Sequence, residues 1–357
     1  MSPSHEDGRR VAVIPGDGVG PEVIAEARRV VDALELPIAW TELPWGSAHW
    51  HEHGTMMPAD AIDTLRGFDA VLLGAVGDPS VPDHESLWGL LLPIRQRLDL
   101  WANLRPARLL DGVPTPLAGR ATTDIDMLFL RENTESEYAG VGGRAHRGLA
   151  HEVAIETSVF TRFAIERLIR LGFELAQGRR GLLTSATKSN ASRYGYVLWD
   201  EVVEEVAADF PDVRIERVLV DALAARMVAS PDSLDVVVAS NLFADILTDL
   251  AAAIQGGMGM AASANVAPGG DAPGVFEPVH GSAPDIAGRG VANPAGAVWS
   301  AALMLEQLGF ESERDTVLGA LEAVCARGVV TADIGGSAGT TEMGSAVAER
   351  VAAAVRR

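Results

Sequence analysis

Short apolar runs recur along the chain, at residues 11–14, 69–77, 126–133 and 235–241, and segments with helical periodicity separate them. Strands that are buried on both faces read as continuous apolar runs, and they alternate with helices when crossover helices cover a parallel sheet. Each run is followed by glycine or polar residues, and open α/β sheets bind their ligands beyond the carboxyl ends of the strands. The pattern therefore predicts an α/β protein.

Two glycine- or histidine-rich stretches resemble binding motifs only superficially. "GDGVG" at 16–20 has the spacing GxGxG followed by Pro21, not GxGxxG, which favours a tight turn from strand to helix over a phosphate loop. "HWHEHG" at 49–54 alternates its histidines, so they cannot share one helical face. His53 followed by Gly54 is more typical of a helix end than of a metal site.

Composition limits the possible partners. The formal net charge is −20, from 29 basic and 49 acidic residues, so we expect neither nucleic acid nor an anionic membrane surface as a partner. No apolar run approaches the roughly 20 residues that span a bilayer, and the start, "MSPSHEDGRR", lacks the apolar core of a signal peptide. A single cysteine, Cys325, fits a reducing compartment. We expect a cytoplasmic protein.

Three arginines stand out against this acidic background: Arg95, Arg105 and Arg131. Guanidinium groups bind carboxylates through paired hydrogen bonds, so three of them could hold a small dicarboxylic acid. Surface ion pairing is the alternative for each one. Arg131 is hardest to explain that way, because it ends an apolar strand and leads into a polar loop that contains Tyr138.

Residues 240–254 have the periodicity of an amphipathic helix that also carries Asp245 and Asp249. These carboxylates lie one turn apart on the same side and repel each other. They form either a solvated polar edge or part of a divalent-cation site with hard oxygen ligands. Lys188, in "LTSATKSNAS", is either a desolvated base or a solvated loop lysine. The glycine- and proline-rich stretch 264–296 is interpreted as a structured binding loop.

Several motifs resemble a known family. "IPGDGVGPEV", "NLRPARL", "RENTESEYAG", "ATKSNAS", "VDALAARMV", "ASNLFADILTDLAAAI" and "FEPVHGSAPDIAGRGVANP" occur in this order over nearly the whole chain. Together they resemble the β-decarboxylating dehydrogenases, the family of isocitrate and isopropylmalate dehydrogenases. "VPDHESLWGLLLPIRQ" at 81–96 is most similar to the tartrate and D-malate dehydrogenase branch. Ser136 and Ala244 depart from this pattern, because they stand where the family motifs carry glycine.

The resemblance implies an isocitrate/isopropylmalate dehydrogenase-like fold of two α/β domains, which is not the Rossmann arrangement and has a cleft between its domains. A large dinucleotide-binding domain is expected from residues 1–103 and 258–357. A smaller domain, 104–257, is expected to carry the substrate and metal residues and the interface of a homodimer. The active site is expected to be shared between the two subunits.

The resemblance also assigns roles to individual residues. Asp245, Asp249 and the other subunit's Asp221 would bind Mg²⁺ or Mn²⁺, and the three arginines would hold the substrate carboxylates. Tyr138 would act as acid and Lys188, reaching in from the neighbouring subunit, as base. The adenosine-binding loop would comprise His280, Gly281, Ser282, Ala283, Asp285 and Asn293.

These assignments predict the metal-assisted oxidation by NAD of a small 2-hydroxy dicarboxylic acid, tartrate or D-malate, with or without loss of the β-carboxylate. NAD is favoured over NADP because the carboxylate of Asp285 repels a 2′-phosphate. A monovalent cation such as K⁺ is a further cofactor that the sequence leaves open. Two alternatives remain: a 3-isopropylmalate or other 3-alkylmalate dehydrogenase, and a non-catalytic regulatory subunit.

Substrate size is predicted from "SLWGLLLPIRQ". On one uninterrupted helix Leu92, Leu91 and Trp88 lie three, four and seven residues before Arg95 and share its face. By the resemblance this helix contacts the C3 substituent of the substrate, so the indole is expected to exclude an isopropyl group. The alternative is that Trp88 only packs in the core.

Overall fold

The computed structural model describes residues 8–356, so the polar start of the chain lies mostly outside it. The chain divides into two compact units, and each is described by itself. Of the described residues, the first unit contains 8–100, 108–122 and 252–356, and the second contains 101–107 and 123–251. Both ends of the chain therefore contribute to the first unit. Among the described residues no helix is both long enough and apolar enough to cross a membrane.

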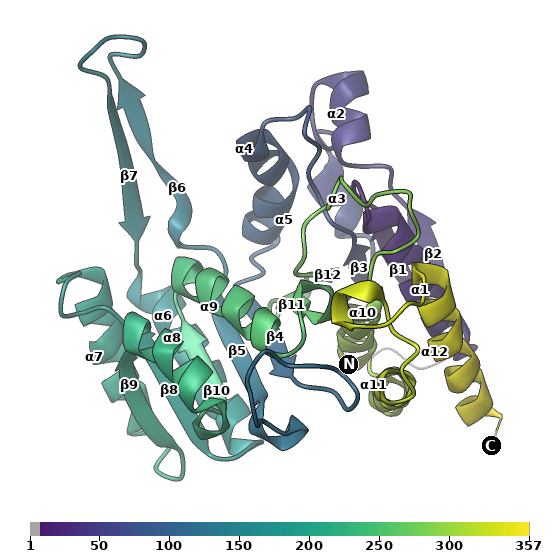
Figure 1. The fold of residues 1–357 in the computed structure, drawn as a ribbon. Coiled ribbons are helices and arrows are strands. Elements are labelled where there is room, and N and C mark those ends of the chain that lie inside the picture. The colour runs from purple at the N-terminus through teal and green to yellow at the C-terminus, as the bar shows by residue number, and fades with distance from the viewer. Residues whose placement is uncertain (1–7, 357) are drawn as a thin grey trace. The chain divides into compact units, whose positions relative to one another are not determined.

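The first unit contains a five-strand arrangement in the order β2-β1-β3-β12-β11, in which only β11 runs antiparallel to its neighbour β12. Helix α1 packs against α10 and α12, and α11 packs against both of them (Figure 1). The elements of this unit are β1 (Arg9–Ile14), α1 (Gly20–Asp32), β2 (Ile38–Glu42), α2 (Ser47–His53), α3 (Ala61–Leu65), β3 (Ala70–Leu73), α4 (Asp83–Ser86), the π-helical turn η1 (Leu87–Leu91), α5 (Leu92–Arg97), η4 (Met258–Met260), β11 (Ala262–Val266), β12 (Gly274–Pro278), α10 (Ala295–Gln307), α11 (Glu311–Ala326), η5 (Ala332–Ile334) and α12 (Thr340–Val355).

The link from β1 to α1 is the tight turn that the sequence predicts. Gly16 and Gly18 both adopt positive φ, and a Cβ on Gly18 would lie 2.0 Å from the carbonyl oxygen of Ser282. Asp17 accepts hydrogen bonds from the backbone N–H groups of Ser47 and Gly77, at 2.9 and 2.8 Å, and so ties three loops together. The glycines thus serve close backbone packing.

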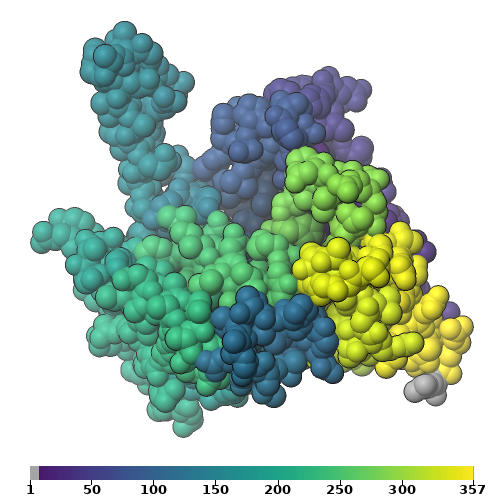
Figure 2. Space-filling model, in the orientation of Figure 1, coloured from purple at the N-terminus to yellow at the C-terminus, as the bar shows by residue number. Residues whose placement is uncertain are grey.

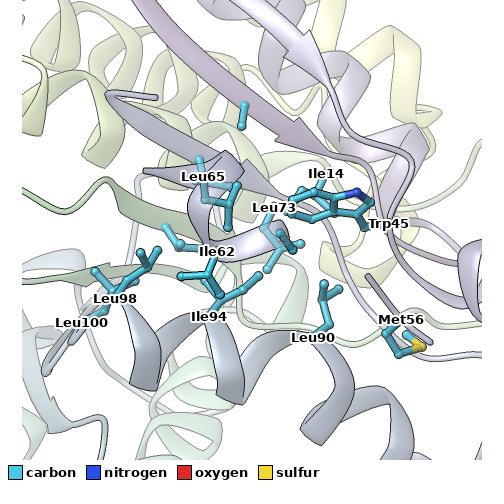
Figure 3. Packing of buried hydrophobic residues seen from close by; sticks show 14 of the residues in the cluster. Ile14, Trp45, Met56, Ile62, Leu65, Leu73, Leu90, Ile94, Leu98 and Leu100 are labelled. Carbon is cyan, nitrogen blue, oxygen red and sulfur yellow. The ribbon is translucent and has the colours of Figure 1, made fainter. Parts of the chain in front are cut away.

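A core cluster of the first unit joins β1 and β3 to the helices α3 and α5 and to the loops around them (Figure 3). Leu73 and Leu90 are fully buried, and Trp45 covers the neighbouring part of the cluster. Burying an aliphatic or aromatic side chain of this size is worth about 1.5–3 kcal/mol relative to exposure. This cluster fixes the position of α5, the helix that carries Arg95.

The second unit is built on a sheet in the order β4-β5-β10-β8-β9, and β5, β10, β8 and β9 are mutually parallel. Its elements are β4 (Ala102–Arg108), η2 (Thr122–Asp124), β5 (Asp126–Glu132), β6 (Ser136–Ala145), β7 (Val153–Val159), α6 (Arg162–Gln177), β8 (Leu182–Thr187), α7 (Gly195–Ala207), β9 (Arg214–Leu219), α8 (Val220–Ala229), η3 (Pro231–Ser233), β10 (Val236–Ala239) and α9 (Asn241–Ile254). Because carboxyl ends of parallel strands meet at one edge, Arg131 on β5, Lys188 after β8 and the start of α9 after β10 all lie there. The α/β prediction is confirmed.

Strands β6 and β7 form a separate antiparallel hairpin that projects away from the rest of the second unit (Figures 1 and 2). Almost all of its side chains beyond Ala139 are exposed, among them Val141, Val153 and Ile155. A two-stranded hairpin is only marginally stable by itself in water. Its apolar residues therefore lack the burial that strands of a sheet normally obtain.

Two other expectations meet different outcomes. Helix α2 ends at His53, and Gly54 follows in the left-handed conformation, as predicted. The stretch 264–296 is not one continuous loop, because β11 and β12 pair within its first half. Periodicity missed them because the stretch is rich in glycine and proline, which are depleted in strands. The second half, residues 279–294, is the loop that leads to α10.

Candidate functional site

Arginine and tyrosine side chains converge on Asp245 in the second unit. The guanidinium of Arg131 forms an ion pair with Oδ1 of Asp245, and the hydroxyl of Tyr138 donates to Oδ2 at 3.0 Å. Nη1 of Arg105 lies 3.6 Å from Oδ1 of the same carboxylate. The sequence-predicted residues Arg105, Arg131 and Tyr138 therefore do lie together around the first aspartate of α9.

Neighbouring amides and hydroxyls hold both arginines in place. Nε of Arg131 donates to Oδ1 of Asn241 at 2.9 Å, and Nε of Arg105 donates to Oδ1 of Asn103 at 2.7 Å. Nη1 of Arg105 also donates to Oγ1 of Thr248 at 2.6 Å. Both guanidinium groups are buried, with 2% of Arg131 and 7% of Arg105 exposed. Buried, pre-oriented guanidinium groups suit recognition of a carboxylate better than flexible surface arginines do.

The two aspartates of α9 differ in their pKa. Burial is the largest influence on Asp245 and raises its pKa, but the positive charges of Arg131 and Arg105 and the Tyr138 bond outweigh it, so the pKa is lowered. Burial and the charge of Asp245 raise the pKa of Asp249, and the arginines offset this only in part. Asp249 therefore lies beside a second carboxyl group whose repulsion the arginines compensate only in part. A divalent cation would compensate it.

Lys188 and Asp221 form a second charged pair in this unit. Nζ of Lys188 donates to Oδ1 of Asp221, and this bond lowers the pKa of the carboxyl. Lys188 follows β8 and Asp221 lies in the first turn of α8. Within residues 8–356 no group of three or more His, Cys, Asp and Glu side chains is placed to hold a metal ion. A single chain therefore does not bring Asp221, Asp245 and Asp249 together.

Arg95 lies in the first unit, on α5. Nη2 of Arg95 contacts Oε1 of Glu277 at 2.6 Å, and Nδ2 of Asn265 donates to the same oxygen at 2.9 Å. Only 4% of Arg95 is exposed, and its Nε has no hydrogen-bond partner among the described residues. The arginine is thus a buried cation that the carboxylate of Glu277 holds in place.

The helix between Trp88 and Arg95 is interrupted, contrary to the prediction of one continuous helix. Pro93 has no N–H, so it cannot continue the α-helical ladder, and the N–H of Leu92 bonds to the carbonyl of Leu87 in a π-helical turn. The turn shifts the register that an uninterrupted helix would keep. Leu92 is buried with Arg95 and Leu91 is half-buried, whereas 41% of Trp88 is exposed. This exposure does not support the alternative that Trp88 is only core packing.

Part of the predicted adenosine loop lines a pocket of about 400 Å³ in the first unit. The predicted residues in its wall are His280, Gly281, Ala283 and Asn293. Sequence reasoning missed the rest of the lining, which is Val19, Met258, Gly259, Ile286, Val291, Ala292 and Asp333. Val19, Ile286, Val291 and Ala292 lie within the family motifs but carry no polar group that would have singled them out, and Met258, Gly259 and Asp333 lie outside those motifs. The wall is largely apolar, as expected of a site for a flat ring.

Polar groups reach this pocket at few points. Burial lowers the pKa of His280, whose Nδ1 lies 3.0 Å from the carbonyl of Gly281, while its Nε2 has no partner in the described part of the chain. Nδ2 of Asn293 donates to Asp333 at 3.1 Å. Ser282 and Asp285 are not in the wall: the carbonyl of Ser282 accepts from the N–H of Val19 at 2.8 Å, and Asp285 is exposed.

The two departures from glycine behave differently. Ser136 is buried and has a φ of 67°, the left-handed conformation that glycine adopts without strain. Ala244 lies inside α9 and is fully buried, so its backbone is regular. The backbone at Ser136 therefore has a conformation that favours glycine, whereas the backbone at Ala244 does not require glycine.

Comparison with known proteins places this geometry in a family. The model of the isocitrate/isopropylmalate dehydrogenase family matches residues 10–347. A probable tartrate dehydrogenase/decarboxylase of Agrobacterium vitis is 50% identical over 96% of this chain and 98% of its own, and the decarboxylating D-malate dehydrogenase of Escherichia coli K12 is 48% identical over 95% and 97%. The crystal structure of isocitrate dehydrogenase from Methylococcus capsulatus superposes with a TM-score of 0.88 at 35% identity, covering 96% of this chain and 99% of that one.

The chain belongs to the isocitrate/isopropylmalate dehydrogenase family, and its fold is the isocitrate dehydrogenase-like fold. Within the family it is similar to proteins named for tartrate and for D-malate, at about half of all positions. The resemblance noted from the sequence motifs is confirmed.

Proposed function

We propose that the chain is an NAD- and divalent-metal-dependent oxidoreductase that oxidises tartrate or D-malate, with or without loss of the β-carboxylate. The observation that carries the proposal is the convergence of Arg105, Arg131 and Tyr138 on Asp245. The two buried guanidinium groups suit the carboxylates of a small dicarboxylic acid, and the adjacent carboxylate and phenol suit reaction at its hydroxyl-bearing carbon. The names of the relatives supply the substrate class.

The residues present fit a hard divalent cation, because the donors offered are carboxylate oxygens and Asp249 repels Asp245. We assign Mg²⁺ or Mn²⁺ to Asp245 and Asp249, with Asp221 of the partner subunit as third ligand. When bound, the cation supplies Lewis acidity to the substrate hydroxyl and to the negative charge that forms as CO₂ leaves. K⁺ remains open as a further cofactor.

The chain's own residues bind, orient and move protons. The guanidinium groups of Arg105 and Arg131 orient the carboxylates, and Arg95 is the third arginine by the family pattern. Lys188 of the partner subunit accepts the hydroxyl proton at Nζ. Tyr138 donates a proton from its hydroxyl to the carbon that lost CO₂. When bound, NAD would supply the acceptor for the hydride that leaves the hydroxyl-bearing carbon.

We assign the dinucleotide to the first unit. Its pocket has an apolar wall suited to adenine. His280 lies in this wall with a lowered pKa, which favours the neutral imidazole, and its buried Nε2 has no hydrogen-bond partner among the described residues. Asp285, on the exposed part of the same loop, would accept bonds from the ribose hydroxyls and repel a 2′-phosphate. NAD is therefore the expected cofactor.

A homodimer would cover the apolar surface of the second unit. Ile155 on the hairpin and Ile246 on α9 are 60% and 61% exposed. A marginally stable hairpin and an uncovered helix face both gain burial when a second copy pairs with them. The dimer would also supply Lys188 and Asp221 to the Asp245 cluster of the other subunit. The buried, single Cys325 is compatible with the cytoplasmic location that we expect.

The test is NAD and NADP reduction with Mn²⁺ over a panel of D-malate, the tartrate isomers, 3-isopropylmalate and isocitrate. We expect turnover of D-malate and a tartrate isomer with NAD, and much poorer turnover of 3-isopropylmalate and with NADP. A preference for 3-isopropylmalate would move the chain to the 3-alkylmalate enzymes. Loss of all turnover despite tight binding would favour a regulatory subunit.

A further inference from the structure

One carboxylate fastens the loop 279–294, which leads from β12 to α10 and is drawn in light green in Figure 1. Glu22, in the first turn of α1, accepts the N–H of Gly288 at Oε1 and the N–H of Gly290 at Oε2, the latter at 3.1 Å. Both glycines have positive φ, 72° and 62°, so the backbone turns sharply on each side of Arg289. These two turns aim both N–H groups at one side chain.

Other contacts hold the loop at its two ends. The carbonyl of Ser282 accepts from Val19 at 2.8 Å, the carbonyl of Gly290 accepts from the N–H of Thr340 at 2.9 Å, and the carbonyl of Ala292 accepts from Oγ1 of Thr340 at 2.7 Å. Between these ends lies the segment 283–289. The bond from Gly288 to Glu22 ties the far end of that segment to α1.

This segment shapes the candidate dinucleotide pocket. Ala283 and Ile286 lie in the wall within the segment, and Val291 lies in the wall just beyond Gly290. A segment that contains Gly288 and is followed by Gly290 loses conformational entropy at these glycines when it is ordered. If the protein orders it before the ligand arrives, the ligand does not bear that cost.

We propose that Glu22 is a positioning residue that pre-orders the dinucleotide loop by holding the peptide groups on both sides of Arg289. It contacts neither the cofactor nor the reacting atoms and acts through Ile286 and Val291. The inference rests on the proposed function, since it takes NAD to be the ligand of this pocket.

Limited trypsin digestion tests the loop order without any cofactor. Arg289 is exposed and lies between the two tethered glycines, and a protease must free several residues around a bond before it cuts. For Glu22→Ala we expect cleavage after Arg289, seen by mass spectrometry as a fragment starting at Gly290, to be roughly tenfold faster than in the parent. Glu22→Gln keeps one acceptor oxygen and is expected to be intermediate. Glu349→Gln removes an exposed charge from α12 and should match the parent.

Kinetics with the intact dimer separate positioning from general structural damage. We expect Glu22→Ala to raise the KM for NAD roughly three- to tenfold, while kcat and the KM for the hydroxy acid stay at the parental values. A merely structural role would lower the melting temperature and affect all three parameters. Glu22→Gln should restore part of the NAD affinity.

The outcomes distinguish the two proposals. If the parent does not bind NAD, the proposed function fails, and the rate of trypsin cleavage still decides whether Glu22 orders the loop. If the parent binds NAD but Glu22→Ala shows parental cleavage and parental KM for NAD, the role of Glu22 is wrong and the proposed function stands.

Discussion

The candidate binding regions of the two units are lined by different chemical groups. In the first unit a pocket is formed largely by backbone and small apolar groups, and its form depends on how a loop is tethered. In the second unit the side chains of Arg105, Arg131 and Tyr138 converge on the carboxylate of Asp245. Substitutions should therefore change cofactor binding gradually in the first unit and abolish catalysis in the second.

The largest effect is expected at Asp245. Asp245→Asn removes the anion that pairs with Arg131 and one of the proposed charged oxygen ligands of the metal. We expect a loss of roughly 10³-fold or more in kcat/KM, because even residues outside the coordination sphere are worth about 10–100-fold at a metal site. The measurement is kcat/KM together with a calorimetric Mn²⁺ titration. Parental Mn²⁺ affinity in the variant would remove the metal assignment.

The first unit also contains a buried ion pair, between Arg95 and Glu277, which contrasts with the largely apolar lining of its pocket. Glu277→Ala leaves the guanidinium of Arg95 buried without its anion, so we expect the protein to lose about 3–5 kcal/mol of unfolding free energy. Denaturant unfolding measures this. Glu205→Ala breaks an exposed ion pair with Arg162 and serves as control, with a nearly unchanged midpoint. Equal unfolding midpoints for the two variants would show that the buried ion pair contributes no more to stability than the exposed one.

Trp88 tests whether substrate size is set in the first unit. Trp88→Ala should shift preference toward larger 3-alkyl substrates, by about 1–3 kcal/mol of discrimination per methylene of the substituent. Relative kcat/KM for D-malate and 3-isopropylmalate measures the shift. Because Trp88 is exposed on this chain, the fold should tolerate the change. An unchanged ranking of the two substrates would rule the indole out as the size determinant.

The smallest effect is expected at Ser136. Glycine relieves left-handed strain worth about 1–2 kcal/mol but makes the unfolded chain more flexible, at a cost of about 0.5–1 kcal/mol. Ser136→Gly should therefore stabilise the protein by about 0.5–1 kcal/mol and leave kcat unchanged. Thermal unfolding decides the sign. A destabilised variant would mean that the hydrogen bond from Ser136 to Glu137 outweighs the strain.

The sequence predicts the regular parts of this molecule well and its interruptions poorly. The runs at 126–133 and 235–241 contain the strands β5 and β10, and the stretch 240–254 contains the helix α9, because apolar patterning reports burial directly. The π-helical turn at 87–91 escaped, since it depends on the missing N–H of Pro93 rather than on periodicity. The contacts of Asp245 with Arg131 and Tyr138 join residues more than 100 positions apart, and only resemblance brought them together beforehand. Asp333 and Val291 were missed because their place in the pocket depends on tertiary packing.

We propose that Lys188 of the partner subunit completes the Asp245 cluster of each chain. Differently tagged Lys188→Ala and Tyr138→Phe chains can be co-expressed and the mixed dimer purified through both tags. Each homodimer should be nearly inactive, whereas the mixed dimer should recover about half of the parental kcat, because one of its two sites contains both Tyr138 and Lys188 intact. A mixed dimer as inactive as the two homodimers would contradict the shared site.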